Sequence, residues 1–154
     1  MNGAHYHLIL SHIPIVGAGF TILLLIFALV RKSKELKCTS LWFAVITGIT
    51  ALAAYFTGDS AENIVKQIPG ITEVIIEPHE NWALYYLLSL LLIAFIALAG
   101  LFVSRASAKI LHKFTVIILV LGLLATMLAV ETALTGGKIR HTEIENVQNV
   151  NIIK

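Results

Sequence analysis

The chain has 154 residues, of which 58% are apolar and 13% are charged, and its formal net charge is +2. The length predicts one domain, and the apolar fraction lies far above that of an ordinary soluble domain. The basic residues are not interleaved with aromatic ones, so we expect no nucleic-acid partner. With Cys38 as its one cysteine and no C-x-x-C-H run, the chain has neither an internal disulfide nor a covalently attached c-type haem.

Four apolar stretches are long enough to cross a hydrocarbon core of about 30 Å. They predict transmembrane helices at 8–30, 39–57, 80–104 and 110–135. The predicted fold class is therefore all-α, with one integral membrane four-helix bundle over residues 1–154. The start of the chain lacks Lys and Arg, and its first apolar run is too long for an ordinary signal peptide, so we expect the first helix to be retained. No internal repeat is evident.

Basic residues concentrate in the segments that follow the first and third predicted helices. These residues are Arg31, Lys32, Lys34 and Lys37 in the first segment, and Arg105, Lys109 and Lys113 in the second. Because Lys and Arg in short loops favour the cytoplasmic face, both segments are predicted to be cytoplasmic. Both termini then lie outside, and we expect a multi-pass protein of the bacterial inner (cytoplasmic) membrane with its termini on the periplasmic side.

The segment between the second and third helices, 58–79, is predicted to be a structured outer loop because it is long for a bare connection. Asp59 and Glu62 fit a capping box, which predicts a short helix over 60–67. The turn Ile68-Pro69-Gly70 is expected to end this helix.

Three expectations concern the chain beyond that turn. The segment ITEVIIE has β-branched character, which favours a strand or an extended stretch. Pro78 suits a first helical position, so the third long helix is expected to begin near His79. Gly136 and Gly137 are expected to break the last helix, leaving an outer tail, 138–154, that either pairs with ITEVIIE or is loosely ordered.

Five of the six histidines fall on the predicted outer side: His5, His7, His12, His79 and His141. His12 is the most informative, because an ionisable group inside an apolar span is costly and points to a function. Pro14 disturbs the helix just beyond it, so we expect the His12 ring to face the bundle interior. The alternative is a neutral imidazole bonded to a neighbouring carbonyl or water.

His12 is predicted to be a ligand of a haem or metal, with His79 as its favoured partner and His141 as the alternative. Glu77 and Glu80 flank His79 and are expected to raise its basicity or to hold its second ring nitrogen. If two sites exist, His7 and His141 form the second pair. Taken alone, His79 is more commonly a surface residue and His141 an ordinary tail residue.

Two basic residues of the last segment, Lys138 and Arg140, are expected near an anionic group, such as the propionates of a haem. Glu131 lies near the end of the last predicted helix and must be protonated, paired or in contact with water. His112, beside Lys113, is interpreted as a marker of the cytoplasmic interface.

Several short runs together resemble a family of small four-helix bacterial membrane proteins catalogued as domain of unknown function 2231. These runs are HLILSHIP, YFTGDSAENI, the opening of a helix at His79, and GGKIRHTE. The resemblance implies the four-helix architecture and a histidine set, and no activity. The positions that match are His7, His12, Pro14, Thr57, Gly58, Asp59, His79, Gly136, Gly137, Arg140 and His141. Ile13 stands where an aromatic residue is usual in the family.

Two histidines from different helices of a bundle are the usual axial ligands of a b-type haem. We therefore expect a cytochrome-b-like electron carrier with one or two haems, which exchanges electrons with a periplasmic or membrane redox protein and is not an enzyme with its own substrate. One alternative is a Zn or Cu site on the same histidines. Another is a non-catalytic subunit or assembly factor of a larger complex, and a homo-oligomer is compatible with each.

Overall fold

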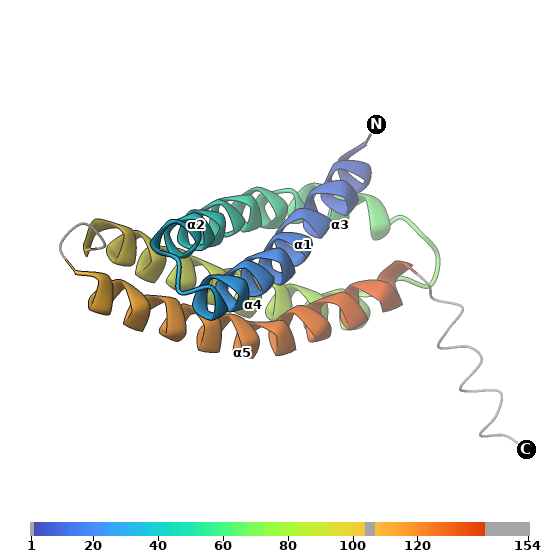
Figure 1. The fold of residues 1–154 in the computed structure, drawn as a ribbon. Helices are drawn as coiled ribbons and strands as arrows, with labels where there is room; N and C mark the ends of the chain where they lie inside the picture. Colours follow the sequence, from blue (N-terminus) through green and yellow to red (C-terminus); the bar gives the residue numbers. More distant parts are fainter. Residues whose placement is uncertain (1, 104–106, 141–154) are drawn as a thin grey trace, which may run out of the picture.

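The computed structural model describes residues 2–103 and 107–140, and all regular structure in this part of the chain is helical. Its elements, in chain order, are α1 (Gly3–Val30), α2 (Lys34–Phe56), α3 (Gly58–Val65), α4 (Glu73–Val103) and α5 (Ala108–Arg140) (Figure 1). Helices α1, α2, α4 and α5 are long and apolar enough to cross a membrane. The predicted all-α architecture with four helices of membrane-spanning length is confirmed.

The four long helices pack in a closed order around the bundle. Helix α1 packs against α2, α2 against α4, α4 against α5, and α5 returns to α1. Helices α1 and α4 therefore face each other across one diagonal. A small residue permits close approach where α2 meets α4, since a Cβ on Gly48 would lie 2.7 Å from the Cβ of Ala94.

Helix α4 begins at Glu73, and the predictions of a strand over ITEVIIE and of a helix start at His79 are both wrong. The apolar residues of this segment lie on a buried and an exposed face of the helix. Ile76 is 3% exposed, whereas Val74 is 79% exposed. Pro78 lies inside the helix. Its missing N–H frees the carbonyl of Val74 in the first turns, where solvent can satisfy it.

The predicted short helix is present as α3, but the expected capping box is not formed. The N-cap residue is Thr57, and its side chain makes no capping hydrogen bond. Glu62 instead pairs with Lys66, which also lies 2.7 Å from a carboxylate oxygen of Glu73. Lys66 therefore links α3 to the start of α4.

Helix α5 runs through Gly136 and Gly137 to Arg140, so the prediction that these glycines break the helix is wrong. A Cβ on Gly136 would lie only 2.9 Å from Cε1 of His79, which shows that this glycine permits a close approach between α4 and α5. Residues 138–140 of the predicted tail thus belong to α5, while 141–154, with the proposed pairing to ITEVIIE, lie outside the described residues.

The buried positions reveal an internal repeat of two helices, which residue identities had hidden. His79 follows His7 at a certain separation along the chain. At this same separation, every buried residue of α1 has a buried counterpart in α4. The pairs are Pro14 with Tyr86, Thr21 with Ile93, Ile22 with Ala94, Leu25 with Ala97, and Ala28 with Gly100. No pair shares a residue type.

The second helices of the two units correspond in part in the same way. At the separation between Thr57 and Thr135, some buried residues of α2 have buried counterparts in α5. The pairs are Lys37 with Thr115, Ser40 with Ile118, and Thr47 with Ala125. The bundle therefore consists of two similar units, α1–α2 and α4–α5.

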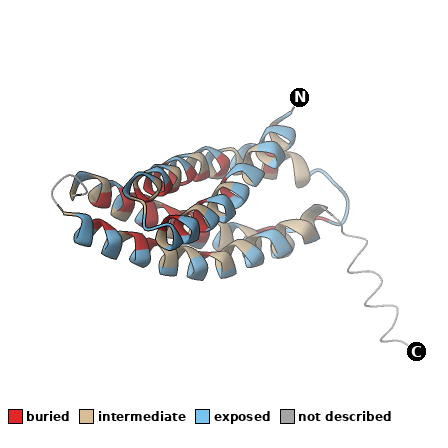
Figure 2. Cartoon of the chain, in the orientation of Figure 1, coloured by how far each residue is buried: buried red, intermediate tan, exposed pale blue. Residues whose placement is uncertain are grey.

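The outward faces of the long helices carry large apolar side chains (Figure 2). Examples from three helices are Val16, 68% exposed, Phe95, 71% exposed, and Met127, 69% exposed. A surface so rich in exposed apolar groups suits contact with lipid and not with water.

Candidate functional site

Two histidines from opposite helices meet at one end of the bundle. His7 lies near the start of α1 and His79 lies near the start of α4, at the end of the bundle that also holds α3 and the end of α5 (Figure 1). Their ring centroids are 6.4 Å apart and the ring planes make an angle of 85°. Both side chains are half-buried.

The ring of His7 is held by the last turn of α2. Its Nδ1 lies 3.0 Å from the carbonyl oxygen of Ala54 and 3.1 Å from Oγ1 of Thr57. Because a carbonyl oxygen only accepts, Nδ1 must carry the hydrogen. In the neutral ring, Nε2 then keeps its lone pair. Carbonyls in the last turn of a helix lack backbone partners within the helix, and the carbonyl of Ala54 accepts from both His7 and the hydroxyl of Thr57.

The ring of His79 is held in the same way by α5. Its Nδ1 lies 3.0 Å from the carbonyl oxygen of Thr132 and 3.4 Å from Oγ1 of Thr135. The carbonyl again assigns the hydrogen to Nδ1 and the lone pair to Nε2. The predicted support of His79 by Glu77 and Glu80 is wrong, because the partner of Nδ1 comes from α5.

The two histidines are held by equivalent hydrogen bonds. In each unit a histidine on the first helix donates to a carbonyl on the second helix, and a Thr-Gly pair follows that carbonyl after the same spacing. The pairs are Thr57-Gly58 and Thr135-Gly136. Our sequence interpretation missed Thr132 and Thr135 as functional residues. The repeated Thr-Gly pair was the signal that could have identified Thr135.

His12 does not join this pair. Its side chain is exposed, and its Nδ1 lies 2.6 Å from the carbonyl oxygen of Leu8 in the same helix. The expectation that the His12 ring faces the bundle interior is therefore wrong. Five positions along a regular helix turn a side chain roughly 140° away from His7, and α1 continues through Pro14 without the irregular backbone that would reverse this.

The remaining sequence candidates lie apart from the pair or outside the described residues. His5 is exposed on α1, and His112 is exposed near the start of α5, at the opposite end of the bundle. Lys138 is exposed on α5, shortly after Gly136. Arg140 is the last residue of α5, and His141 lies outside the described residues.

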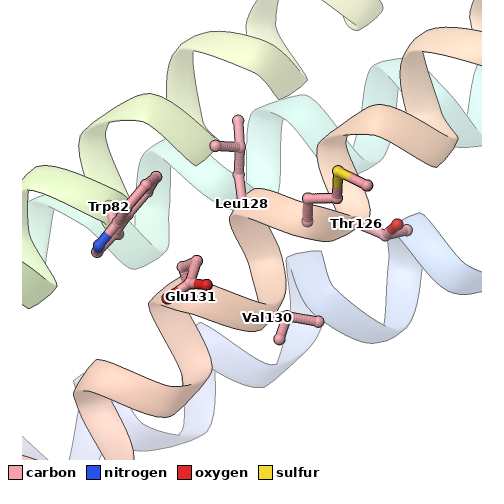
Figure 3. Close-up of a pocket in the computed structure, with 6 residues that line it drawn as sticks. Trp82, Thr126, Leu128, Val130 and Glu131 are labelled. Atoms are coloured by element: carbon pink, nitrogen blue, oxygen red, sulfur yellow. The ribbon is translucent and has the colours of Figure 1, made fainter.

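A hollow of about 510 Å³ lies on the surface between α4 and α5, and neither His7 nor His79 lines it. Trp82 lines it from α4, one turn after His79, and the other lining residues come from α5 (Figure 3). Glu131, which directly precedes Thr132, is one of these lining residues and is exposed. A second hollow, of about 460 Å³, is lined by His12 with Phe20 and Phe43 among others.

The pair supplies two imidazole nitrogens and no further protein ligand. Within residues 2–103 and 107–140, no three His, Cys, Asp or Glu side chains are close enough together to hold a metal ion. A closed site for a bare metal is thus not formed by the described part of the chain. No family model matches this chain, and neither a curated protein nor a solved structure matches it.

Proposed function

We propose that the protein is a membrane-bound, cytochrome-b-like electron carrier that holds one haem between His7 and His79. The separation of the two rings supports this proposal. With metal–nitrogen bonds of about 2 Å, two imidazoles on opposite sides of one metal have ring centres roughly 6 Å apart. The observed separation of 6.4 Å agrees with this value.

The hydrogen bonds of the two rings also suit axial ligation. A ligating histidine commonly donates its other ring N–H to a carbonyl or carboxylate, which fixes the tautomer and raises the basicity of the ligating nitrogen. His7 and His79 both donate through Nδ1 to carbonyl oxygens. Each ring is therefore prepared to bind a metal through Nε2.

The number of donors favours haem over a bare Zn or Cu ion. A protein zinc site uses four ligands, or three with a water, whereas the described residues offer no group of three. A haem brings four nitrogens of its own and needs only two axial ligands. One histidine pair accordingly supports one haem. Zn or Cu on the same pair stays the alternative function.

A haem held by His7 and His79 would supply one-electron chemistry. The chain itself would hold and orient the group and leave no position for oxygen, which makes it a carrier. Lys138 is exposed on α5, two positions after Gly136, and by this position in the sequence we assign to it the pairing of a propionate. Arg140 is a candidate for the same task by its position in the sequence.

We further propose that the histidine end of the bundle faces the periplasm. The opposite end carries the basic residues Arg31, Lys32 and Lys34, which favour the cytoplasm. A periplasmic or membrane redox protein would then exchange electrons at the histidine end. The resemblance to domain of unknown function 2231 supports the same site, because His7, Thr57, Gly58, His79 and Gly136 are among the matching positions.

The optical spectrum and iron content of the detergent-purified protein test the proposal. We expect a Soret band and about one iron per chain, with both lost in His7→Ala and in His79→Ala. His12→Ala and His112→Ala are matched controls that should keep the spectrum, because both side chains are exposed and lie apart from the pair. Circular dichroism and size-exclusion chromatography show whether each variant is folded.

The other possible results would favour one of the alternative functions or contradict the ligand pair. Zn or Cu without a Soret band would replace the haem proposal by the metal alternative. A wild-type protein with neither, produced with ample haem and metal, would overturn both and favour a non-catalytic subunit. Loss of haem in His12→Ala with retention in His7→Ala would contradict the ligand pair.

A further inference from the structure

We propose that Thr57 and Thr135 are equivalent positioning residues, whose hydroxyls act together with the carbonyls of Ala54 and Thr132 to hold the rings of His7 and His79 in one tautomer, so that one ligand binds between two matched half-sites. This inference rests on the proposed function for the identity of the ligand. The tautomer itself is a property of the protein without ligand and can be measured separately.

The hydroxyl of Thr57 is oriented by the backbone. Oγ1 donates to the carbonyl oxygen of Ala54 at 2.7 Å. With its hydrogen used in this bond, the hydroxyl oxygen can only accept from Nδ1 of His7, which is 3.1 Å away. The Nδ1–H group therefore meets two acceptors. The opposite tautomer would place the Nδ1 lone pair against two oxygen lone pairs.

Thr135 repeats this arrangement in the second unit. Its Oγ1 donates to the carbonyl oxygen of Glu131 at 2.7 Å and lies 3.4 Å from Nδ1 of His79. The hydroxyl again offers an acceptor to the ring N–H. Since this distance is longer than the one at Thr57, we expect the hydroxyl of Thr135 to contribute less.

Helix capping does not account for the orientation of Thr57. This residue is the N-cap of α3, yet its side chain makes no capping hydrogen bond there. An N-cap threonine ordinarily accepts from an amide of the first turn. Here the hydroxyl turns to Ala54 and His7 instead.

Thr126 provides a control for Thr135 on the same helix. The exposed hydroxyl of Thr126 donates to the carbonyl oxygen of Leu123 at 2.5 Å. Thr126→Val thus removes a hydroxyl from α5 and leaves the proposed arrangement around His79 intact. Thr50, whose hydroxyl donates to the carbonyl of Thr47, serves the same purpose for α2.

The test compares Thr57→Val and Thr135→Val with Thr126→Val and Thr50→Val, and with the rescue variants Thr57→Ser and Thr135→Ser. In ligand-free, ¹⁵N-histidine-labelled protein, long-range ¹H–¹⁵N NMR reports the tautomer of each ring. We expect the wild type, the serine variants and the two controls to show the Nδ1–H tautomer at His7 and His79. Thr57→Val and Thr135→Val should each weaken this preference and raise the share of the other tautomer, at their own histidine only, because one of the two acceptors of the ring N–H is removed and the carbonyl remains.

Haem affinity supplies the second measurement. Loss of a hydrogen-bond partner behind a metal ligand typically weakens metal binding by about 10- to 100-fold. We expect haem dissociation constants to rise within this range in the valine variants, more in Thr57→Val than in Thr135→Val, and to recover with serine. An unchanged tautomer in both valine variants would overturn the positioning role whether or not haem binds. A wild type that binds no haem but shows the tautomer effects would overturn the proposed function and retain the positioning role.

Discussion

The hydroxyl of Tyr86 donates to the carbonyl oxygen of Pro14 at 3.3 Å, across the diagonal between α1 and α4. These residues lie about two helical turns after His79 and His7, respectively. Both are buried, and they occupy corresponding positions of the two-helix units. Helices α1 and α4, which carry the two histidines, thus make a second polar contact deeper in the bundle.

Removal of this contact should lower the stability of the bundle. We expect Tyr86→Phe to reduce the free energy of unfolding by about 1 kcal/mol, the usual net value of one hydrogen bond. Chemical unfolding in mixed detergent measures this change. Tyr85→Phe is the control, because Tyr85 is 53% exposed. Equal effects of the two variants would show that the Pro14 contact contributes nothing specific.

Two adjacent glycines of α5 should respond in opposite ways to the same substitution. A Cβ on Gly136 would lie 2.9 Å from Cε1 and 3.2 Å from Nδ1 of His79, whereas nothing lies within 4 Å of one on Gly137. Gly136→Ala should therefore displace the His79 ring and weaken haem binding. Gly137→Ala should leave binding unchanged and stabilise the helix by up to about 1 kcal/mol.

Titration of the purified variants with haem, together with their thermal unfolding, checks this prediction. Gly58→Ala adds a graded comparison, because its Cβ would lie 3.9 Å from Cε1 of His7, an ordinary contact distance. We expect it to bind haem nearly as well as the wild type. Wild-type binding by Gly136→Ala would show that His79 is free to shift or is not a ligand.

The membrane orientation can be tested with single cysteines in a Cys38→Ser background. On intact cells, a membrane-impermeant maleimide should react with Asn2→Cys and Gly70→Cys. Lys34→Cys and Ser107→Cys should react only after the cells are opened, because the basic segments beside them favour the cytoplasm. The reverse pattern would place the histidine pair on the cytoplasmic side.

Lys66 should hold α3 against the start of α4 over the whole physiological pH range. Hydrogen bonds to Glu62, and then to Glu73, raise the pKa of Lys66 above its ordinary value of 10.5. Because the folded-state pKa of this base is raised, its contribution is complete below the unfolded-state pKa and is lost only as pH rises through the folded-state value. The contribution of the ion pairs of Lys66 should thus be constant between about pH 7 and pH 9.

Hydrogen exchange of the amides of α3 measures this local effect. Lys66→Gln should speed their exchange, after correction for intrinsic rates, by a similar factor throughout that range. Global stability should change little, because exposed ion pairs contribute little. Lys109→Gln, at the other end of the bundle, is the control. A factor that falls toward one as pH rises across this range would contradict the assigned pKa direction.

The amino-acid sequence by itself determined the four long helices, because a membrane span requires only a sufficient run of apolar residues. An ideal helix also places His5 and His12 on one face that excludes His7, and both are exposed in the structure, although the sequence interpretation had turned His12 toward the bundle interior. Local rules failed at Pro78 and at Gly136. There the helices continue, through a proline near a solvated helix start and through a glycine pressed against His79.

Only the tertiary structure decided which histidines meet. In the sequence, His7 was a weaker ligand candidate than His12. His12 lies beside a proline inside an apolar span, whereas His7 has an ordinary helical position. The packing of α1 and α4 across the diagonal brought His7 to His79, and the carbonyls of Ala54 and Thr132 oriented both rings. Every residue has a carbonyl, so these partners leave no mark in the sequence. The repeat of the two units was hidden because the corresponding buried positions of α1 and α4 carry different residue types.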